Sequence, residues 1–454
     1  MPLSKPLKHI IMNYRFLYWI TFVSVNSGLL FGLNMAGISG AIPFLKDFYG
    51  LNDIALGLAV SSIIIGCLFG SLFAGSLSDK YGRRKMMVIT AVLFMISALG
   101  CSLTSSFWLF VISRILGGLA VGSAAVLSPT YISEIAPAER RGTLVSYNQF
   151  AIVIGILLAY FIDYALVGLD SGWRYMLAVP LIFGLIFLLL LHISFPESPR
   201  WLVKVGKSDK AKEILEKLGG ADYAKTELMA IRAAGSDQKG DSGVHVRDLF
   251  KGRLGYVVLL GTLLAAFQQI TGINAVVNYA PSIFQKTGVG SDVALLQSII
   301  VGFVNFLFTI VAIRLVDRSG RKTLLTWGAA GMTISLLYLS LAFNASGLGV
   351  LISLLAYIAF FAASLAPVMW VVTSEIYPTR IRGVAMSFST AVSWIFTLIV
   401  VQFFPWMLSN LGGTASFGIF AFFSLAALLF IIFFIPETKG KSLEQIEKDL
   451  KIGH

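Results

Sequence analysis

The sequence of 454 residues predicts an all-α membrane protein with twelve transmembrane helices, arranged as two parallel six-helix repeats with short helices between the halves. Three observations predict this fold class: apolar runs long enough to cross a bilayer, motifs that occur twice in the same order, and Lys and Arg in alternate loops. Hydrophobic residues make up 57% of the chain and charged residues 13%. A soluble core of this length could not bury so much apolar surface.

Twelve apolar runs have the length of about 20 residues that a spanning helix needs. The polar stretch 196–252 separates the first six from the last six, and residues 209–218 within it have apolar positions at helical spacing. We therefore expect a six-helix bundle at 1–195, cytoplasmic linker helices at 196–252, a second bundle at 253–436 and a tail at 437–454. The runs centre near Leu29, Ile65, Phe94, Gly118, Ile154, Leu185, Gln269, Phe303, Thr333, Phe360, Ile395 and Leu425.

The strongest sign of internal organisation is a repeat with a period of about 240 residues. Each of three motifs occurs once in each half, in the same order, which indicates a six-span unit duplicated without inversion. The pairs are Asp79-Lys-Tyr-Gly-Arg-Arg84 with Asp317-Arg-Ser-Gly-Arg-Lys322, Ser133–Gly142 with Ser374–Gly383, and Pro196-Glu-Ser with Pro436-Glu-Thr.

Basic residues alternate between loops, and this asymmetry sets the expected orientation. By the positive-inside rule, the loops rich in Lys and Arg are cytoplasmic. Both termini should then face the cytoplasm, in a multi-pass protein of the cell (inner) membrane. The basic segments are Lys5 to Arg15, Lys80 to Lys85, Arg140 with Arg141, the stretch after Arg200, Arg318 to Lys322, Arg380 with Arg382, and the tail.

Several other classes of function are disfavoured by the residue pattern. The net charge of +12 follows from orientation, and without a basic face carrying stacking aromatics it predicts no nucleic-acid partner. Cys67 and Cys101 lie in or beside apolar spans, where a disulfide is not expected. The sequence has no nucleophile, metal-ligand or phosphate-loop constellation. We therefore expect neither an enzyme nor a cofactor.

From about Gly28 to Leu450, the motifs together resemble the sugar porter family of the major facilitator superfamily, both its glucose facilitators and its bacterial sugar/proton symporters. The resemblance implies the major facilitator fold and alternating access by a monomer in a lipid bilayer. It also implies a monosaccharide cargo, with a hexose such as glucose expected. Further matching motifs are Gly32-x-Asn-x-x-Gly-Ile-Ser-Gly40, Arg114-x-x-x-Gly118, Pro196-Glu-Ser-Pro-Arg200-Trp-Leu, Gln268-Gln-x-x-Gly-Ile-Asn274 and Pro436-Glu-Thr-Lys-Gly440.

The resemblance also implies a sugar site between the two halves. Amides suit neutral hydroxyl groups because each offers donors and an acceptor, and an aromatic ring can cover an apolar sugar face. The alternative is that these amides only hydrogen-bond one helix to another. Ser393 and Thr397 stand where glucose facilitators carry larger amides, so we expect a roomier site or one that reaches its ligand through water. The implied site residues are Gln149, Ile152, Gln268, Gln269, Asn274, Asn305, Trp370 and Trp394, and Asn278 with Tyr279 occupies the place of the family's outer gate.

Energy coupling depends on one position in the first span. Proton-coupled members of the family carry an Asp at the place of Asn34, paired with the Arg matched by Arg114. An amide cannot titrate, so the sequence favours a facilitative uniporter, with a proton-coupled symporter as the alternative. A non-transporting sugar receptor is less favoured because the segment after Pro436 is short. Asp163, near the outer end of the fifth span, is the alternative proton site, but its closeness to Gly168 and Asp170 in the outward loop favours a solvated interfacial carboxylate.

Charged residues at the cytoplasmic helix ends recur in both halves, and the resemblance makes them an inner gate. Ion pairs there would hold the cytoplasmic side shut in the outward-facing state and separate on inward opening. The alternative, that these loops only satisfy the positive-inside rule, leaves the matched acids unexplained. The set is Asp79, Arg83, Glu134, Arg141, Glu197, Arg200, Asp317, Arg321, Glu375, Arg382 and Glu437.

Overall fold

The computed structural model describes residues 12–137, 140–237, 249, 252–345, 347–378, 381–441 and 445, with the backbone alone at 234–237, 313, 317 and 318. Regular structure in these residues is helical throughout. Twelve helical segments are long and apolar enough to cross a membrane. Each predicted span centre falls in a separate one of these segments, so the fold class is confirmed.

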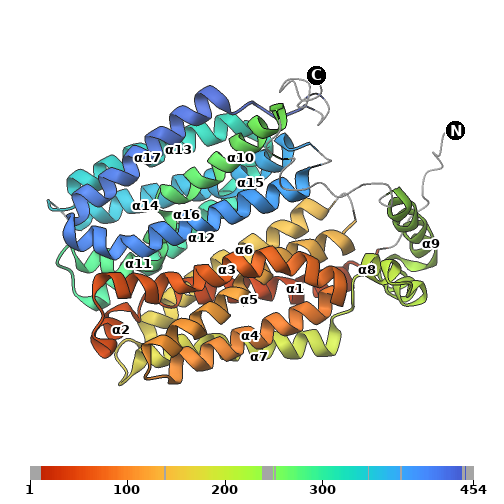
Figure 1. Cartoon of the computed structure of the whole chain (residues 1–454), viewed down its shortest axis with the longest axis horizontal. Coiled ribbons are helices and arrows are strands. Elements are labelled where there is room, and N and C mark those ends of the chain that lie inside the picture. Colours follow the sequence, from red (N-terminus) through yellow and green to blue (C-terminus); the bar gives the residue numbers. More distant parts are fainter. Residues whose placement is uncertain are drawn as a thin grey trace.

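The two six-span halves lie side by side along their length (Figure 1). The first half consists of α1 (Tyr14–Ala36), α2 (Ile42–Tyr49), α3 (Asp53–Tyr81), α4 (Arg83–Leu103), α5 (Phe107–Ile135), α6 (Arg141–Leu166) and α7 (Gly172–Ser194). The second consists of α10 (Gly252–Ile270), α11 (Ile273–Gln285), α12 (Ser291–Ser319), α13 (Arg321–Ala342), α14 (Gly347–Ala363), α15 (Leu365–Ile376), α16 (Arg382–Asn410) and α17 (Gly412–Phe434).

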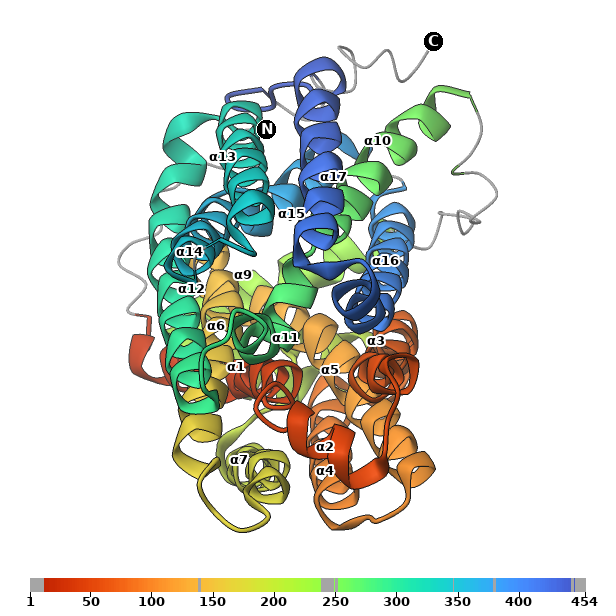
Figure 2. The same cartoon turned by 90° about the vertical axis from the view of Figure 1, so that its left-hand side faces the viewer.

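Three helices outside the spans mark the opposite ends of the bundle. Between the halves, α8 (Pro199–Lys204) and α9 (Ser208–Asp237) lie at one end, hereafter the α9 end, and α2 lies at the other, the α2 end (Figure 1). The expected linker helices are therefore present, with a break inside α9 at Gly220, where φ is 81°. Viewed from the α2 end, α6 lies beside α12 and α3 beside α16, and these pairs connect the halves (Figure 2).

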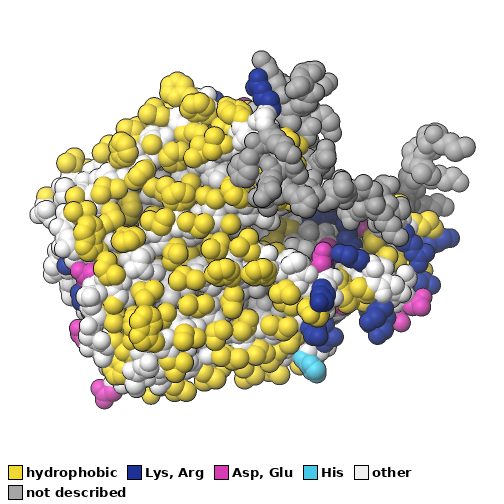
Figure 3. Space-filling model, viewed as in Figure 1, with side chains coloured by type: hydrophobic (Ala, Val, Ile, Leu, Met, Phe, Trp, Pro, Cys, Tyr) yellow, Lys and Arg dark blue, Asp and Glu magenta, His cyan; other side chains and the backbone are white. Residues whose placement is uncertain are grey.

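The surface of the bundle matches a protein that lies in lipid. Hydrophobic side chains cover its flank, while Lys and Arg gather over the α9 end (Figure 3). Large apolar residues such as Phe69 and Phe73 are about half exposed in the middle of α3. A soluble monomer rarely exposes an apolar area of this extent, whereas a bilayer covers it.

Glycines let neighbouring helices approach to backbone contact. A Cβ atom on Gly118 of α5 would overlap the carbonyl oxygen of Ile63 on α3, and one on Gly32 of α1 would overlap the carbonyl oxygen of Ile152 on α6. Small residues at such crossings favour association because helices in lipid gain mainly from close packing. The helix α6, which carries Gln149 and Ile152, packs against α1 in this way.

The seventh and tenth spans are broken, which the sequence did not predict. Gly272, with φ of 94°, separates α10 from α11, and Ser364 separates α14 from α15. The hydroxyl of Tyr357 on α14 donates to the carbonyl of Thr271 (2.9 Å), and the amide of Gln268 on α10 donates to the carbonyl of Leu365 (2.9 Å). Each break therefore receives a donor from the other broken span, because an unpaired backbone group in hydrocarbon costs several kcal/mol.

Gly118→Ala should destabilise the bundle, since the added methyl group has no space against the carbonyl of Ile63. Overpacking of this kind costs about 1–3 kcal/mol. Gly75→Ala is the matched control, because nothing lies within 4 Å of a Cβ at that position on α3. Thermal unfolding of the purified protein in detergent should show a lower midpoint for Gly118→Ala and an unchanged one for Gly75→Ala. Equal midpoints would contradict the packing described.

Candidate functional site

An unbroken chain of amide hydrogen bonds crosses the break in the seventh span. The amide of Asn274 donates to Gln269 (2.6 Å), and that of Gln269 donates to Gln268 (2.9 Å), whose own amide donates to the carbonyl of Leu365. Gln268 and Gln269 are 4% and 8% exposed. The break at Gly272 brings the three side chains together.

Trp394 of α16 has a buried donor that remains available. Its indole Nε1 has no hydrogen-bond partner among the described residues. Its ring lies 6.3 Å, centroid to centroid, from that of Phe31 on α1, so it reaches from the second half to the first. Buried tryptophan N–H groups normally find a partner. A donor without one at the boundary between the halves is a candidate contact for a polar ligand.

The remaining implied site residues are more dispersed. Gln149 is exposed and Ile152 is 9% exposed on α6, while Asn305 on α12 and Trp370 on α15 are half-buried. Because α6 packs against α12, Gln149, Ile152 and Asn305 come from neighbouring helices of opposite halves. The described hydrogen bonds connect none of their side chains to the amide chain.

Ser393 and Thr397 on α16 are both buried. They are 5% and 1% exposed, and the Thr397 hydroxyl donates to the carbonyl of Ser393 (2.8 Å) within α16. Both therefore pack between helices.

The coupling position of the family holds a neutral contact. Arg114, 3% exposed on α5, donates through Nη1 to the backbone carbonyl of Asn34 (3.0 Å), while the Asn34 amide donates to the carbonyl of Leu30 (2.9 Å). Arg114 Nε has no partner among the described residues. A small cavity adjoins the two side chains, lined also by Ser97, Cys101 and Pro180.

At the α2 end, the halves are joined by polar contacts that sequence reasoning missed. The hydroxyl of Tyr160 on α6 donates to the carbonyl of Val277 on α11 (2.7 Å). Gln402 of α16 accepts from the Ser61 hydroxyl (2.7 Å) and donates to the carbonyl of Ile54 (2.9 Å) on α3. A polar residue in an otherwise apolar span was the available signal for Gln402. It did not indicate which helix the side chain would meet.

The expected outer-gate pair is packed within its own half. Asn278 and Tyr279 are 1% and 2% exposed. The Tyr279 hydroxyl donates to the carbonyl of Val401 (3.0 Å), and the Asn278 amide donates to the carbonyl of Asn274 (2.7 Å). The gate residues are thus linked to the amide chain through Asn274, while the described closure between halves is made by Tyr160 and Gln402.

At the α9 end, the first half holds a charge cluster centred on Arg83. Its guanidinium pairs with Glu134 (2.8 Å) and Asp79 (2.8 Å), and Lys204 also pairs with Asp79 (3.0 Å). Arg83 and Glu134 are only 9% and 12% exposed at the side chain. These pairs lie within the first half and its adjoining helix α8.

The second half repeats this arrangement with Arg321 and Glu375, 3.3 Å apart. The described ion pairs of both clusters lie within a half, whereas an inner gate holds the halves together by pairs between them. Arg141 and Arg382 donate to the carbonyls of Ala136 (3.5 Å) and Tyr377 (3.2 Å). Arg200 pairs with Glu227 at 3.9 Å. The side chain of Asp317 lies outside the described residues.

Glu197 and Glu437 explain why the repeated motif needs a glycine before its arginine. Glu197 accepts from the backbone N–H of Arg83 (2.9 Å), and Glu437 accepts from that of Arg321 (2.9 Å). Each carboxylate therefore caps the start of a spanning helix, where unpaired N–H groups favour an anion. The preceding Gly82 has φ of 100°, a conformation that side chains disfavour, and a Cβ there would meet Glu197.

The two capping carboxylates differ in burial. Burial raises the pKa of Glu197, against the opposing effect of N–H donors from Ser198 and the start of α4. Burial also acts to raise the pKa of Glu437, but its backbone N–H donors outweigh this and the pKa is lowered. Glu197 is therefore the more readily protonated of the two.

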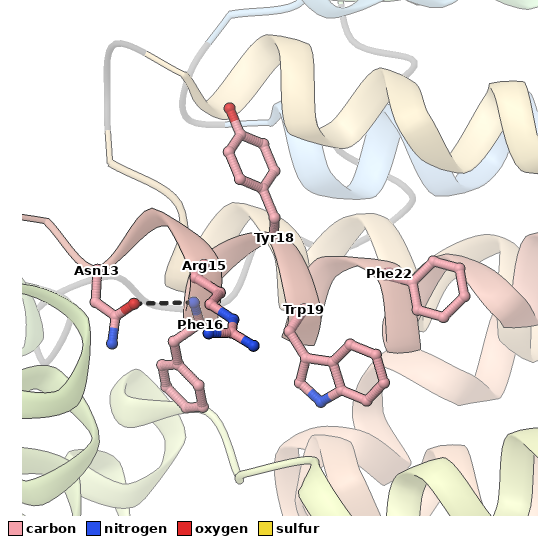
Figure 4. Close-up of a pocket in the computed structure, with 6 residues that line it drawn as sticks. All are labelled: Asn13, Arg15, Phe16, Tyr18, Trp19 and Phe22. Carbon is pink, nitrogen blue, oxygen red and sulfur yellow. Dashed lines mark hydrogen bonds between the residues drawn. The ribbon is translucent and has the colours of Figure 1, made fainter.

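A surface groove at the start of α1 contains none of the implied site residues. It is formed by Asn13, whose side chain accepts from the N–H of Phe16 (3.1 Å), together with Arg15, Tyr18, Trp19 and Phe22 (Figure 4). Aromatic rings and an arginine at the end of a span are typical of the membrane–water interface. The groove is therefore not a candidate transport site.

Asp163 is not solvated, which corrects the expectation from the sequence. Its exposed fraction is 0%. One carboxylate oxygen, Oδ2, accepts from the Ser39 hydroxyl (3.1 Å) and the Gly40 N–H (2.8 Å) in the turn after α1. The cause is tertiary: α6 continues beyond Asp163 to Leu166 and packs this residue against the turn.

A family model described as "Sugar (and other) transporter" matches residues 19–450, nearly the whole chain. The chain belongs to this sugar transporter family. Membership makes it a transporter and not an enzyme. It is similar to the arabinose-proton symporter of Bacillus subtilis (40% identical, covering 93% of this chain and 92% of the relative) and to the D-xylose-proton symporter of Escherichia coli (40%, covering 96% of both).

Solved structures of the xylose transporter XylE are similar to this sugar transporter over most of both chains. The inward-open conformation from E. coli has a TM-score of 0.84 at 39% identity, covering 95% of this chain and 99% of that one. The proton:xylose symporter XylE bound to 6-bromo-6-deoxy-D-glucose has a TM-score of 0.79 at 39% identity, covering 96% and 100%.

Neutralising one acid of the repeated clusters should slow transport more than it weakens sugar binding. In Glu134→Gln or Glu375→Gln, an arginine that is at least four-fifths buried loses a charged partner, while the amide chain is untouched. Removing one member of a buried pair costs about 3–5 kcal/mol in the conformation that contains it. We expect the maximal uptake rate in proteoliposomes to fall about tenfold and KM to change less than about threefold.

Glu227→Gln is the control for this prediction, because Glu227 belongs to a long, exposed pair with Arg200. Thermal stability of each variant would separate lost transport from lost folding. Unchanged rates in both cluster variants would contradict a role for the clusters in the conformational change.

Proposed function

We propose that this chain carries a neutral monosaccharide of pentose or hexose size, together with protons, across the cell (inner) membrane by alternating access. The single observation that carries the sugar assignment is the amide chain from Asn274 through Gln269 to Gln268, placed at the break in the seventh span. Amides offer both donors and acceptors without a charge, which matches the neutral hydroxyl groups of a sugar. Trp394 adds an aromatic surface and an indole N–H donor that has no partner in the described part of the chain.

The proposed size of the sugar follows from the sugars named for similar proteins. Relatives at 40% identity are named for arabinose and for D-xylose, which are pentoses, and XylE is also solved with a derivative of D-glucose, a hexose. Gln149, Ile152, Asn305 and Trp370 would complete the pocket from the helices on its other sides. Closure around a ligand between the halves is the general way in which transporters of parallel repeats bind cargo.

The proposed orientation places the α9 end in the cytoplasm. Lys and Arg gather there, which the positive-inside rule assigns to the cytoplasmic face. Both termini would then be cytoplasmic, and the α2 end would face outward. On this assignment, Tyr160 and Gln402 close the outer side. One chain supplies both halves of the pathway, so we propose a functional monomer surrounded by lipid. We propose that the boundaries between the first bundle, the linker, the second bundle and the tail lie at 195/196, 252/253 and 436/437.

Proton coupling is proposed because both of those pentose transporters are named proton symporters. The second candidate is facilitative uniport, which Asn34 favours: an amide at the family's coupling position cannot bind and release a proton, and Arg114 contacts only its backbone carbonyl. The two candidates differ in one property. A symporter concentrates sugar against its gradient when protons flow inward, whereas a uniporter only equilibrates it.

The test is uptake of radiolabelled xylose, arabinose, glucose and galactose into proteoliposomes, with an imposed inward proton gradient. We expect internal sugar to exceed the external concentration and to return to equilibrium after a protonophore is added. Uptake that stops at equilibrium with or without the gradient would establish uniport. Absence of counterflow with all four sugars would overturn the assignment of a monosaccharide cargo.

Gln269→Ala should weaken sugar binding, because it removes the central link of the amide chain and leaves Gln268 and Asn274 without their partner. Losing two hydrogen bonds at about 0.5–1.5 kcal/mol each corresponds to a rise in KM of about tenfold. The control is Asn410→Ala, whose amide bonds only to the carbonyl of Trp406 at the exposed end of its own helix. Counterflow concentration curves measure both, and equal KM values would place the sugar elsewhere.

A further inference from the structure

Asp163 is a fully buried carboxylate that the sugar site and the charge clusters leave unused. It lies one turn before the end of α6 and contacts the turn that follows α1. The glycine in that turn allows this contact, since a Cβ on Gly40 would lie 2.6 Å from the Asp163 carboxyl carbon. The carboxylate is therefore held between the two helices that carry Asn34 and Gln149.

The hydrogen bonding of this carboxylate is half complete. Oδ2 accepts from the Ser39 hydroxyl and the Gly40 N–H, but Oδ1 is buried and has no partner among the described residues. A buried polar atom without a partner costs about 1–3 kcal/mol, and more if the group is charged. Such a group is retained for a use other than stability.

The charged and titratable groups around α6 do not neutralise it. On its own helix, Tyr160 donates its hydroxyl to Val277, and Tyr164 is exposed. Arg114 of α5 donates to the carbonyls of Asn34 and Val60, while Arg174 of α7 donates to those of Ser102 and Thr104. On α12, Asp292 stands at the exposed first turn. An ionised Asp163 would thus be a buried charge without a counter-ion, whereas a protonated one would be neutral.

The position of Asp163 also connects it to the closure between the halves. Tyr160, one turn earlier on α6, makes the hydrogen bond to Val277 on α11 that joins the halves at the α2 end. Its ring also packs against Gly302 of α12. A change of charge one turn away, against the turn after α1, would alter the energy of this packing. A group works as a switch when its two protonation states favour different arrangements of such contacts.

We propose that Asp163 is the proton-carrying carboxylate of this transporter, standing on the fifth span in place of a titratable group in the first. This inference rests on the proposed symport. The ionised carboxylate takes up one proton from the side to which it is open, and the neutral acid releases that proton to the other side after the halves have moved. No other bond forms or breaks.

The experiment compares two readouts in proteoliposomes. Accumulation driven by a proton gradient requires protons to move with sugar, whereas counterflow at equal pH requires only alternating access and sugar binding. Asp163→Asn keeps an acceptor for Ser39 and Gly40 but cannot titrate. We expect it to lose accumulation entirely, so that sugar only equilibrates, while counterflow stays within about threefold of the wild type. Asp170→Asn, in an exposed loop position, should leave both readouts unchanged.

Ser39→Ala provides a variant that keeps the carboxylate, in case Asp163→Asn does not fold. It removes one donor that stabilises the ionised form, so the proton should be held more tightly. The pH at which accumulation falls to half should then move upward relative to the wild type. An unmoved midpoint, or accumulation that persists in folded Asp163→Asn, would overturn the role of Asp163 and leave symport intact. Absence of accumulation in the wild type would instead refute the proposed symport itself.

Discussion

Every polar group between these helices must be satisfied by another part of the same chain, because the hydrocarbon of a bilayer offers neither donors nor acceptors. This constraint accounts for the paired breaks in the seventh and tenth spans. Tyr357 donates a hydrogen bond to the carbonyl of Thr271, and Gln268 donates one to the carbonyl of Leu365. It also gives meaning to the exceptions. Among the described residues, Trp394 Nε1 and Asp163 Oδ1 are buried without a partner, and these are the atoms that we propose for the sugar and the proton.

The twelve spans could be predicted because apolar length is a local property of the sequence, and the two halves because their motifs repeat. The breaks could not be predicted, because Gly272 and Ser364 lie within apolar runs. Only hydrogen bonds from the other broken span compensate for the interrupted helix. The role of Glu197 and Glu437 as helix caps depends on contacts about 115 residues apart in sequence. The repeated Pro-Glu motif was evident in the sequence, but its role in capping a helix was not.

The candidate site was predicted unevenly for a related reason. Gln268, Gln269 and Asn274 were found as a motif and do form one hydrogen-bonded chain, which crosses the break in the seventh span. Asp163 was misplaced because its neighbours in sequence, such as Asp170, suggested water, while its neighbours in space are Ser39 and Gly40. Burial is set by packing between α6 and the turn after α1, which no local pattern encodes.

The coupling position and the buried carboxylate complement each other. Asn34 makes the first span neutral at the place where the resemblance implies an acid in proton-coupled members, and Arg114 donates to backbone carbonyls. The same helix pair, α1 and α6, holds an unpaired acid further toward the α2 end. If Asp163 carries the proton, an amide at position 34 is compatible with relatives that are proton symporters.

The most direct test of this account is to measure protons taken up when sugar binds to the purified protein. Reciprocal linkage requires that, if a proton favours sugar binding, sugar also favours proton binding. Saturating xylose added in weakly buffered solution, over a series of pH values, should cause uptake approaching one proton per protein on the alkaline side, and none in Asp163→Asn. Sugar binding without proton uptake at any pH in the wild type would contradict the coupling of sugar to a proton.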